Sequence, residues 1–168
     1  MNSAKIIQLI VMTNKELKIA YQEYDSLEEL ESIDRTLAEA AIEATSLSYA
    51  PYSNFNVGAA VMYEDGEIVK GSNQENAAYP SAMCAERTTL FYASSNRPEA
   101  AMKALAIAAC QNGVLTKSPV TPCGACRQVM SQYQTKSGIP MQIILIGNDK
   151  ILKFNKVEDL LPFTFDCI

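Results

Sequence analysis

Three cysteines and one glutamate stand at a spacing that suits a metal site. Cys84 lies two residues before Glu86, and Cys123 and Cys126 lie in the segment Pro-Cys-Gly-Ala-Cys that starts at Pro122. Catalytic zinc takes three protein ligands and a water, whereas structural zinc takes four protein ligands. Three thiolates with a carboxylate beside them therefore favour a catalytic zinc site, with the three cysteines as metal ligands.

The two motifs have to be weighed together. Cys123 and Cys126 alone are equally typical of a redox pair or of half a four-cysteine zinc site. A fourth thiolate would have to come from Cys110 or Cys167. Cys110 falls in an expected core strand, where a thiol is most often a small buried hydrophobe, and Cys167 is close to the last residue. The combination with Cys-x-Glu therefore favours catalysis.

The sequence contains no histidine. Imidazole acid/base catalysis, histidine-based triads and histidine-ligated metals are excluded, because each of them needs a histidine from the chain. Thiolates, carboxylates and hydroxyls remain as candidate catalytic groups.

The composition limits which binding partners and which cellular compartment are expected. A chain of 168 residues with 48% hydrophobic residues fits one domain with a substantial core. The net charge of −5 opposes binding to nucleic acid and suits a small neutral or cationic ligand. Five cysteines at metal or redox spacing favour a reducing compartment, so a cytoplasmic location is expected. No apolar run approaches the roughly 18 to 20 residues of a membrane span.

Hydrophobic periodicity predicts helices between sheet-length strands. Residues 26–29 have the form of a capping box, and Asp65-Gly66 between two apolar runs predicts a hairpin. The expected strands are 57–63, 68–72, 102–110, 141–146 and 151–154, and the expected helices are 27–47, 84–96, 125–133 and 157–161. This order predicts a layered α/β domain over residues 26–168, preceded by an N-terminal extension, residues 1–25, of unknown role.

Charged residues near these elements have two different interpretations. The acidic residues of the first helix are interpreted as a solvated face: Glu28, Glu29, Glu31 and Asp34.

A zinc ion with three thiolates carries a net negative charge, which must be offset before a bound water can ionise near neutral pH. Helix starts at Cys84 and Cys123 would favour that charge, and Arg87 is expected to offset it, with Arg127 as a second candidate.

Six short stretches match one known family in order. They are Tyr49–Phe55, Val57–Ala60, Asn73–Tyr79, Cys84–Thr88, Pro122–Val129 and Leu160–Phe165. On these residues the chain resembles the cytidine deaminase family in its homotetrameric form, from about residue 38 to residue 165. The departures are the segment before about residue 30 and Gln74, where an aliphatic residue is usual, and both concern peripheral contacts.

The resemblance implies a fold and an activity. The fold would have three layers, α/β/α, around a mixed five-stranded sheet, with one zinc ion per subunit. The reaction would be hydrolytic deamination of cytidine and deoxycytidine to uridine and deoxyuridine with release of ammonia, a step of pyrimidine salvage. Glu86 would move protons from water to ring N3 and to the departing amino group without binding the metal.

The resemblance also assigns expected substrate contacts. Phe55 would pack against the pyrimidine, Ala85 would contact the substrate, and Asn73 and Glu75 would hydrogen-bond the ribose. Phe55 as a core residue and Asn73 as a turn residue are the plain alternatives. Two aromatic residues, Tyr79 and Phe165, would reach into the site of a neighbouring subunit of a homotetramer, or else be ordinary core residues.

Three rival functions stay open. A deaminase of another cytosine-containing small molecule, such as blasticidin S, shares the Pro-Cys-Gly-x-Cys-Arg and Leu-Leu-Pro segments but lacks the Asn73–Tyr79 motif and Arg87. A non-catalytic zinc-stabilised interaction module gives no reason for Glu86. A nucleic-acid editing deaminase is disfavoured by the acidic charge and by the lack of a Lys/Arg-rich run.

Overall fold

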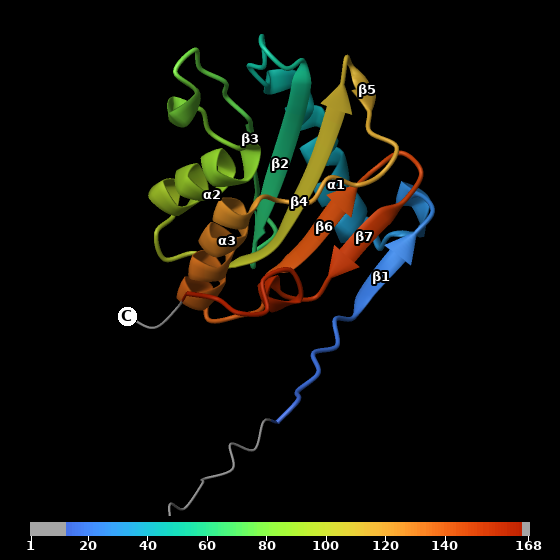
Figure 1. The fold of residues 1–168 in the computed structure, drawn as a ribbon, viewed down its shortest axis with the longest axis vertical. Coiled ribbons are helices and arrows are strands. Elements are labelled where there is room, and N and C mark those ends of the chain that lie inside the picture. Colours follow the sequence, from blue (N-terminus) through green and yellow to red (C-terminus); the bar gives the residue numbers. More distant parts are fainter. Residues whose placement is uncertain (1–12, 166–168) are drawn as a thin grey trace, which may run out of the picture.

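The computed structural model describes residues 13–165, which build a twisted sheet with helices on both faces (Figure 1). The strands are β1 (Tyr21–Tyr24), β2 (Phe55–Tyr63), β3 (Ile68–Ser72), β4 (Met102–Gln111), β5 (Val114–Leu115), β6 (Gln142–Ile146) and β7 (Ile151–Phe154). The helices are α1 (Ser32–Ala44), α2 (Ala85–Asn96) and α3 (Gly124–Ser137). Short 3-10 turns lie at Leu27–Glu29, Thr45–Leu47, Tyr79–Ser81 and Val157–Asp159.

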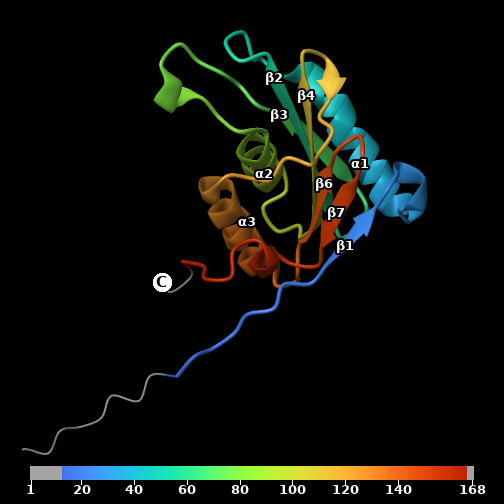
Figure 2. The ribbon, with the colours of Figure 1, turned by 45° about the vertical axis from the view of Figure 1, so that its right-hand side comes forward.

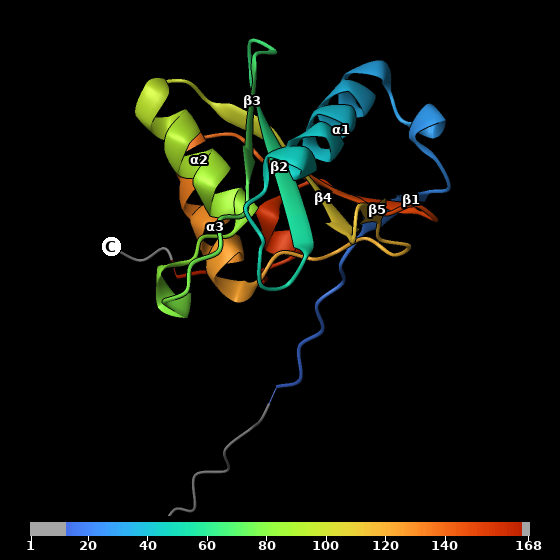
Figure 3. The same cartoon turned by 90° about the horizontal axis from the view of Figure 1, so that it is seen from above.

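The sheet is mixed and lies between two helical layers. Its order is β1-β7-β6-β4-β2-β3, with β5 paired to β4, and β4 and β6 run parallel while the other neighbours run antiparallel. Figures 2 and 3 show α2 and α3 on one face and α1 on the other. The expected three-layer α/β/α architecture is confirmed. Among the described residues no helix is long and apolar enough to cross a membrane.

The expected count of five strands was wrong, because the described part of the chain contributes seven to the sheet. The two additional strands are β1 and β5. β5 is two residues long and follows a turn at Asn112 and Gly113, which both have positive φ, as a two-residue hairpin loop requires. β1 is largely exposed and carries no alternating apolar pattern, although Tyr21 packs on Phe154 of β7 at 5.5 Å between ring centroids. The sheet therefore begins before the domain boundary expected at residue 26.

The long helix expected over residues 27–47 is interrupted. α1 covers only Ser32–Ala44, because Leu30 and Glu31 have extended backbone, with ψ of 149° and 148°. Leu30 is buried in the core between α1 and the sheet. The expected capping box is also incomplete, since Ser26 makes no side-chain cap and Glu29 accepts instead from the backbone N–H of Asp25 at 3.0 Å.

The central strand β4 decides how closely each helical layer approaches. Because side chains alternate across a strand, three of its alanines face α1 while two larger side chains face α2 and α3. The residues on the α1 side are Ala104, Ala106 and Ala108, and those on the other side are Leu105 and Ile107. Gly58 of β2 extends the close approach, because a Cβ there would lie 2.2 Å from the carbonyl oxygen of Ala41.

Asp34 is not part of a solvated acidic face, so that interpretation was wrong for this residue. Its side chain is buried, with 6% of the residue exposed, and Oδ2 accepts from Nζ of Lys153 at 2.5 Å. Lys153 lies on β7, so the ion pair joins α1 to the sheet. The local sequence around Asp34 did not predict this ion pair, because Lys153 lies 119 residues further along the chain.

Removing the Asp34 carboxylate should destabilise the protein strongly. Asp34→Asn leaves the Lys153 ammonium buried without its counter-ion, and we expect a loss of about 3 kcal/mol in the free energy of unfolding. Glu43→Gln is the matched control, since Glu43 pairs with Lys70 at 2.9 Å on the surface with 68% of its side chain exposed, and should cost about 1 kcal/mol or less. Chemical denaturation of both variants measures the difference, and equal losses would contradict a structural role for the buried pair.

Candidate metal centre and active site

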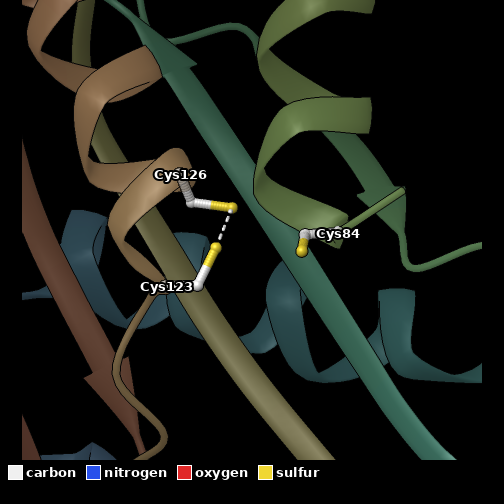
Figure 4. Close-up of side chains that lie close together, drawn as sticks. All are labelled: Cys84, Cys123 and Cys126. Carbon is white, nitrogen blue, oxygen red and sulfur yellow. Dashed lines mark hydrogen bonds between the residues drawn. The ribbon is translucent and has the colours of Figure 1, made fainter. Parts of the chain in front are cut away.

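The three cysteines of the two motifs meet at one point in the fold. Their Sγ atoms all lie within 4.8 Å of one another, and those of Cys123 and Cys126 are 3.4 Å apart. Figure 4 shows the side chains of Cys84, from α2, and of the α3 pair turned toward one another. Cys84 is the N-cap residue of α2 and Cys123 that of α3, with Cys126 in the first turn of α3. The expected placement of both motifs at helix starts is confirmed.

The sulfur cluster fits a metal ion held by three thiolates. Zinc–sulfur bonds of about 2.3 Å require sulfur atoms a few ångströms apart, which is the spacing found. Within residues 13–165 this cluster contains no fourth Cys, Asp or Glu ligand. Cys110, a candidate fourth ligand, instead donates its thiol to Oγ1 of Thr45 at 3.5 Å, and Cys167 lies outside the described residues. Among the described residues the cluster therefore offers three ligand atoms to a metal ion.

The cluster already favours negative charge at Cys84. A hydrogen bond from the Cys126 thiol lowers the pKa of Cys84 to about 5, with a further contribution from the Arg87 guanidinium, whose Nη2 lies 3.7 Å from Cys84 Sγ. The same hydrogen bond, together with burial, raises the pKa of the Cys126 thiol. Because a metal ion binds the thiolate form, its arrival at this site would release the protons that remain.

Glu86 lies in the first turn of α2, beside the cluster but outside it. Only 5% of the residue is exposed, and burial raises the pKa of its carboxyl above the ordinary value, with the charge of Cys84 acting in the same direction. A carboxyl group whose pKa lies closer to neutrality can both accept and return a proton. The buried position of Glu86 therefore suits proton transfer beside the sulfur cluster.

The two arginines that follow the motifs have different contacts. Arg87 reaches Cys84, and its Nε is buried with no hydrogen-bond partner among residues 13–165. Arg127 instead donates from Nε to the carbonyl of Pro122 at 2.9 Å and from Nη1 to the carbonyl of Leu160 at 2.7 Å. Arg87 is thus the arginine in contact with the sulfur cluster. Arg127 instead joins the start of α3 to the C-terminal segment through hydrogen bonds.

A cavity of about 460 Å³ opens beside the metal centre. Its lining includes nearly all the residues expected to contact substrate, together with two of the cysteines and the candidate proton-transfer group: Phe55, Asn73, Glu75, Tyr79, Ala85, Cys84, Cys123 and Glu86. Phe165 is the exception, since it is not part of this lining. It is 70% exposed, and its backbone N–H and carbonyl pair with the side chain of Gln128 at 3.2 and 2.7 Å.

Asn73 is held rigidly at the wall of this cavity. Its Oδ1 accepts from the Ser48 hydroxyl at 2.5 Å and from the backbone N–H of Val57 at 2.8 Å, and its Nδ2 donates to the carbonyl of Phe55 at 2.9 Å. One amide hydrogen is left to donate, since an amide carries two. The neighbouring Gln74, where an aliphatic residue was expected, donates its side-chain amide to the Ser72 hydroxyl at 3.1 Å.

Sequence reasoning gave no role to Ser48 and Ser53. Ser53 donates its hydroxyl to Oε1 of Glu75 at 2.5 Å, as Ser48 does to Asn73. Ser53 stands inside a matched stretch, but a serine next to asparagine and two residues after proline is typical of any turn. The spacing of more than 20 residues between each serine and its partner left no local signal.

Comparisons with known proteins agree with this site. The model of the family described as "Cytidine and deoxycytidylate deaminase zinc-binding region" matches residues 31–141. A cytidine deaminase from Sporosarcina psychrophila is 41% identical over 133 residues, which span 79% of this chain and 90% of the relative. The crystal structure of cytidine deaminase from Burkholderia pseudomallei has a TM-score of 0.65 and 39% identity, and covers 77% of this chain and 97% of its own.

A more distant relative represents one of the rival functions. Blasticidin-S deaminase from Bacillus cereus is 27% identical over 134 residues, which span 79% of this chain and 91% of the relative. Its identity is well below that of the Sporosarcina protein over a similar span. The family model covers more than half of the chain, and the three thiolates lie together as a zinc site requires. This chain therefore belongs to the cytidine and deoxycytidylate deaminase zinc-binding family.

Proposed function

We propose that this protein is a zinc-dependent hydrolase that converts cytidine and deoxycytidine to uridine and deoxyuridine and releases ammonia. One observation carries the proposal: a buried glutamate, Glu86, stands beside three converging cysteine thiols at the wall of a cavity large enough for a nucleoside. Cys84, Cys123 and Cys126 hold the zinc ion. When bound, zinc supplies a Lewis acid that lowers the pKa of a water in the fourth position.

Glu86 performs the proton transfers. Its carboxylate accepts a proton from the attacking water as the water oxygen adds to C4 of the cytosine ring, and it delivers that proton to ring N3. A second proton then passes through the same carboxylate to the amino group, the C4–N bond breaks, and ammonia leaves. The raised pKa of the Glu86 carboxyl supports this role, because a strong acid would hold the proton too weakly to deliver it.

The other wall residues bind the nucleoside. Phe55 covers one face of the pyrimidine, and Ala85, at the start of α2, contacts the base. Asn73 offers its remaining amide hydrogen to the ribose, and the Glu75 carboxylate accepts from a ribose hydroxyl. A free base leaves the remaining amide hydrogen of Asn73 and the remaining acceptor position of Glu75 without a substrate partner, which is costly for polar groups committed to a site.

The assembly and the cellular role extend this proposal. Tyr79 and Phe165 are 75% and 70% exposed, which is unusual for large aromatic residues and suits contacts with a neighbouring subunit in a homotetramer with shared sites. A site built on free thiolates suits the reducing cytoplasm, and recovery of uridine from cytidine suits pyrimidine salvage.

The role of Glu86 is tested by Glu86→Gln. The amide keeps the shape of the side chain but cannot relay a proton, so turnover of cytidine should fall on the order of 10² or more. Zinc content, measured by metal analysis on the same sample, should stay at one ion per chain, because Glu86 is not a ligand. Loss of zinc together with activity would make Glu86 a metal ligand, and near-normal turnover would remove it from the mechanism.

The role of Arg87 is tested by zinc retention. Arg87→Gln removes the cation that lies 3.7 Å from Cys84 Sγ, so the three-thiolate site should lose zinc to a competing chelator about tenfold more readily. Arg35→Gln is the control, since it removes the same charge from the exposed pair with Glu39 on α1, across the sheet. Equal zinc retention in the two variants would contradict charge compensation by Arg87.

Substrate choice is tested by ammonia release from a panel of compounds. Cytidine and deoxycytidine should react with comparable efficiency, because both keep the 3′-hydroxyl, and free cytosine should be much poorer. Deoxycytidine monophosphate should be rejected, because Arg87 is the one cation among the described residues that line the cavity and it is engaged with Cys84. Efficient turnover of the nucleotide, or of blasticidin S in place of cytidine, would overturn the nucleoside assignment.

A further inference from the structure

The hydroxyl of Ser53 bridges two residues of the cavity wall. It donates to Oε1 of Glu75 at 2.5 Å and accepts from the backbone N–H of Phe55 at 3.0 Å. The other carboxylate oxygen of Glu75 accepts from the backbone N–H groups of Tyr52 and Ser53, at 2.9 and 3.3 Å. The carboxylate is therefore fixed in place by three donors from a single loop.

These three donors leave Glu75 with one defined acceptor position. A carboxylate has about four lone-pair sites, two on each oxygen. The two backbone N–H groups occupy those on Oε2, and the serine hydroxyl occupies one on Oε1. The remaining site belongs to Oε1, and Glu75 lines the cavity. The direction in which Glu75 can accept a substrate hydroxyl is thus set by the Ser53 hydrogen bond.

The same donors keep Glu75 ionised. The Ser53 hydroxyl, followed by the Tyr52 N–H, lowers the pKa of the Glu75 carboxyl below its ordinary value. A carboxylate can only accept hydrogen bonds, whereas the protonated acid would also donate. The loop therefore presents an acceptor that matches the donor of a sugar hydroxyl.

Several hydrogen bonds hold this loop without the Ser53 hydroxyl. Asn54 adopts a positive φ of 52°, and its N–H donates to the carbonyl of Ala50 at 3.0 Å. The side-chain amide of Gln111 donates to the carbonyls of Ser53 and Asn54, both at 3.2 Å. These bonds do not involve the serine hydroxyl, so they stay available to the loop in Ser53→Ala, in which the N–H of Phe55 and the Glu75 carboxylate each lose one partner.

We infer that Ser53 is a positioning residue for sugar recognition, which aims the Glu75 carboxylate at a hydroxyl of the nucleoside. The inference rests on the proposed function, because that function supplies the nucleoside substrate with its sugar. Ser53 acts through Glu75 and does not touch the reacting atoms. Removing the Ser53 hydroxyl should weaken the use of substrates that carry a 2′- or 3′-hydroxyl and spare those that lack both.

The test compares cytidine with 2′,3′-dideoxycytidine, measured with enough enzyme to follow the slower substrate. Ser53→Ala should lower kcat/KM for cytidine about tenfold, mainly through KM, as expected for loss of one hydrogen bond to a charged group. The loss for the dideoxy compound should stay below about twofold. Ser53→Thr keeps a hydroxyl and should recover most of the cytidine activity. Ser46→Ala is the matched control, because Ser46 is exposed and its hydroxyl donates to the carbonyl of Glu43, outside the cavity.

A second comparison tests whether Ser53 acts through the Glu75 carboxylate. In a Glu75→Ala background, Ser53→Ala should change kcat/KM for cytidine by less than about twofold, because the group that it positions is gone. Equal losses on both substrates, or a full further loss in the Glu75→Ala background, would overturn the inference and assign Ser53 to Phe55 or to loop structure. Gross unfolding of Ser53→Ala in a thermal melt would do the same. Failure of the unsubstituted protein to deaminate cytidine would instead refute the proposed function.

Discussion

Three thiolates brought within a few ångströms of one another repel, and the fold around Cys84, Cys123 and Cys126 is organised to offset that repulsion. Two helices begin at the cluster, so their unpaired N–H groups and their dipoles favour negative charge there. Arg87 adds a full positive charge at 3.7 Å from one sulfur atom. The compensation matters for chemistry, because an excess of negative charge makes the metal a poorer Lewis acid.

The sheet determines that these two helix starts meet. α2 and α3 pack on the same face, and their inner side chains share one core with β2, β4 and β6. At Gly71 of β3 a Cβ would lie 2.4 Å from Oγ1 of Thr89, so α2 sits directly on the strand. On the opposite face Gly58 and the small side chains of β4 admit α1 equally closely. Both helical layers therefore pack closely against the strand backbones. This packing holds the three cysteines and the cavity wall in fixed relative positions.

The metal centre was predictable from sequence because its members fall in two short motifs, each of recognisable spacing. Cys84, Glu86 and Arg87 share one helical turn, and Cys123 and Cys126 share another, so their relative positions follow from local geometry. The layered α/β class followed from the alternation of helical and strand patterns in the same way. The hairpin at Asp65-Gly66 was likewise predicted by its turn residues, and Gly66 has the positive φ that the turn requires.

The parts that sequence did not predict depend on partners far apart in the chain. The buried pair of Asp34 with Lys153 and the bond from Ser53 to Glu75 join residues whose local patterns resemble a solvated helix face and an ordinary turn. β1 has no apolar alternation, because it is an edge strand with most of its surface exposed. Such features follow from tertiary packing, which overrides the local signal.

X-ray absorption at the zinc edge of the purified full chain measures which atoms bind the metal. Three sulfur atoms at about 2.3 Å and one oxygen at about 2.0 Å are expected, as in a catalytic site with an open position. A shell of four sulfur atoms would contradict it, since such a site is structural and leaves no position for water.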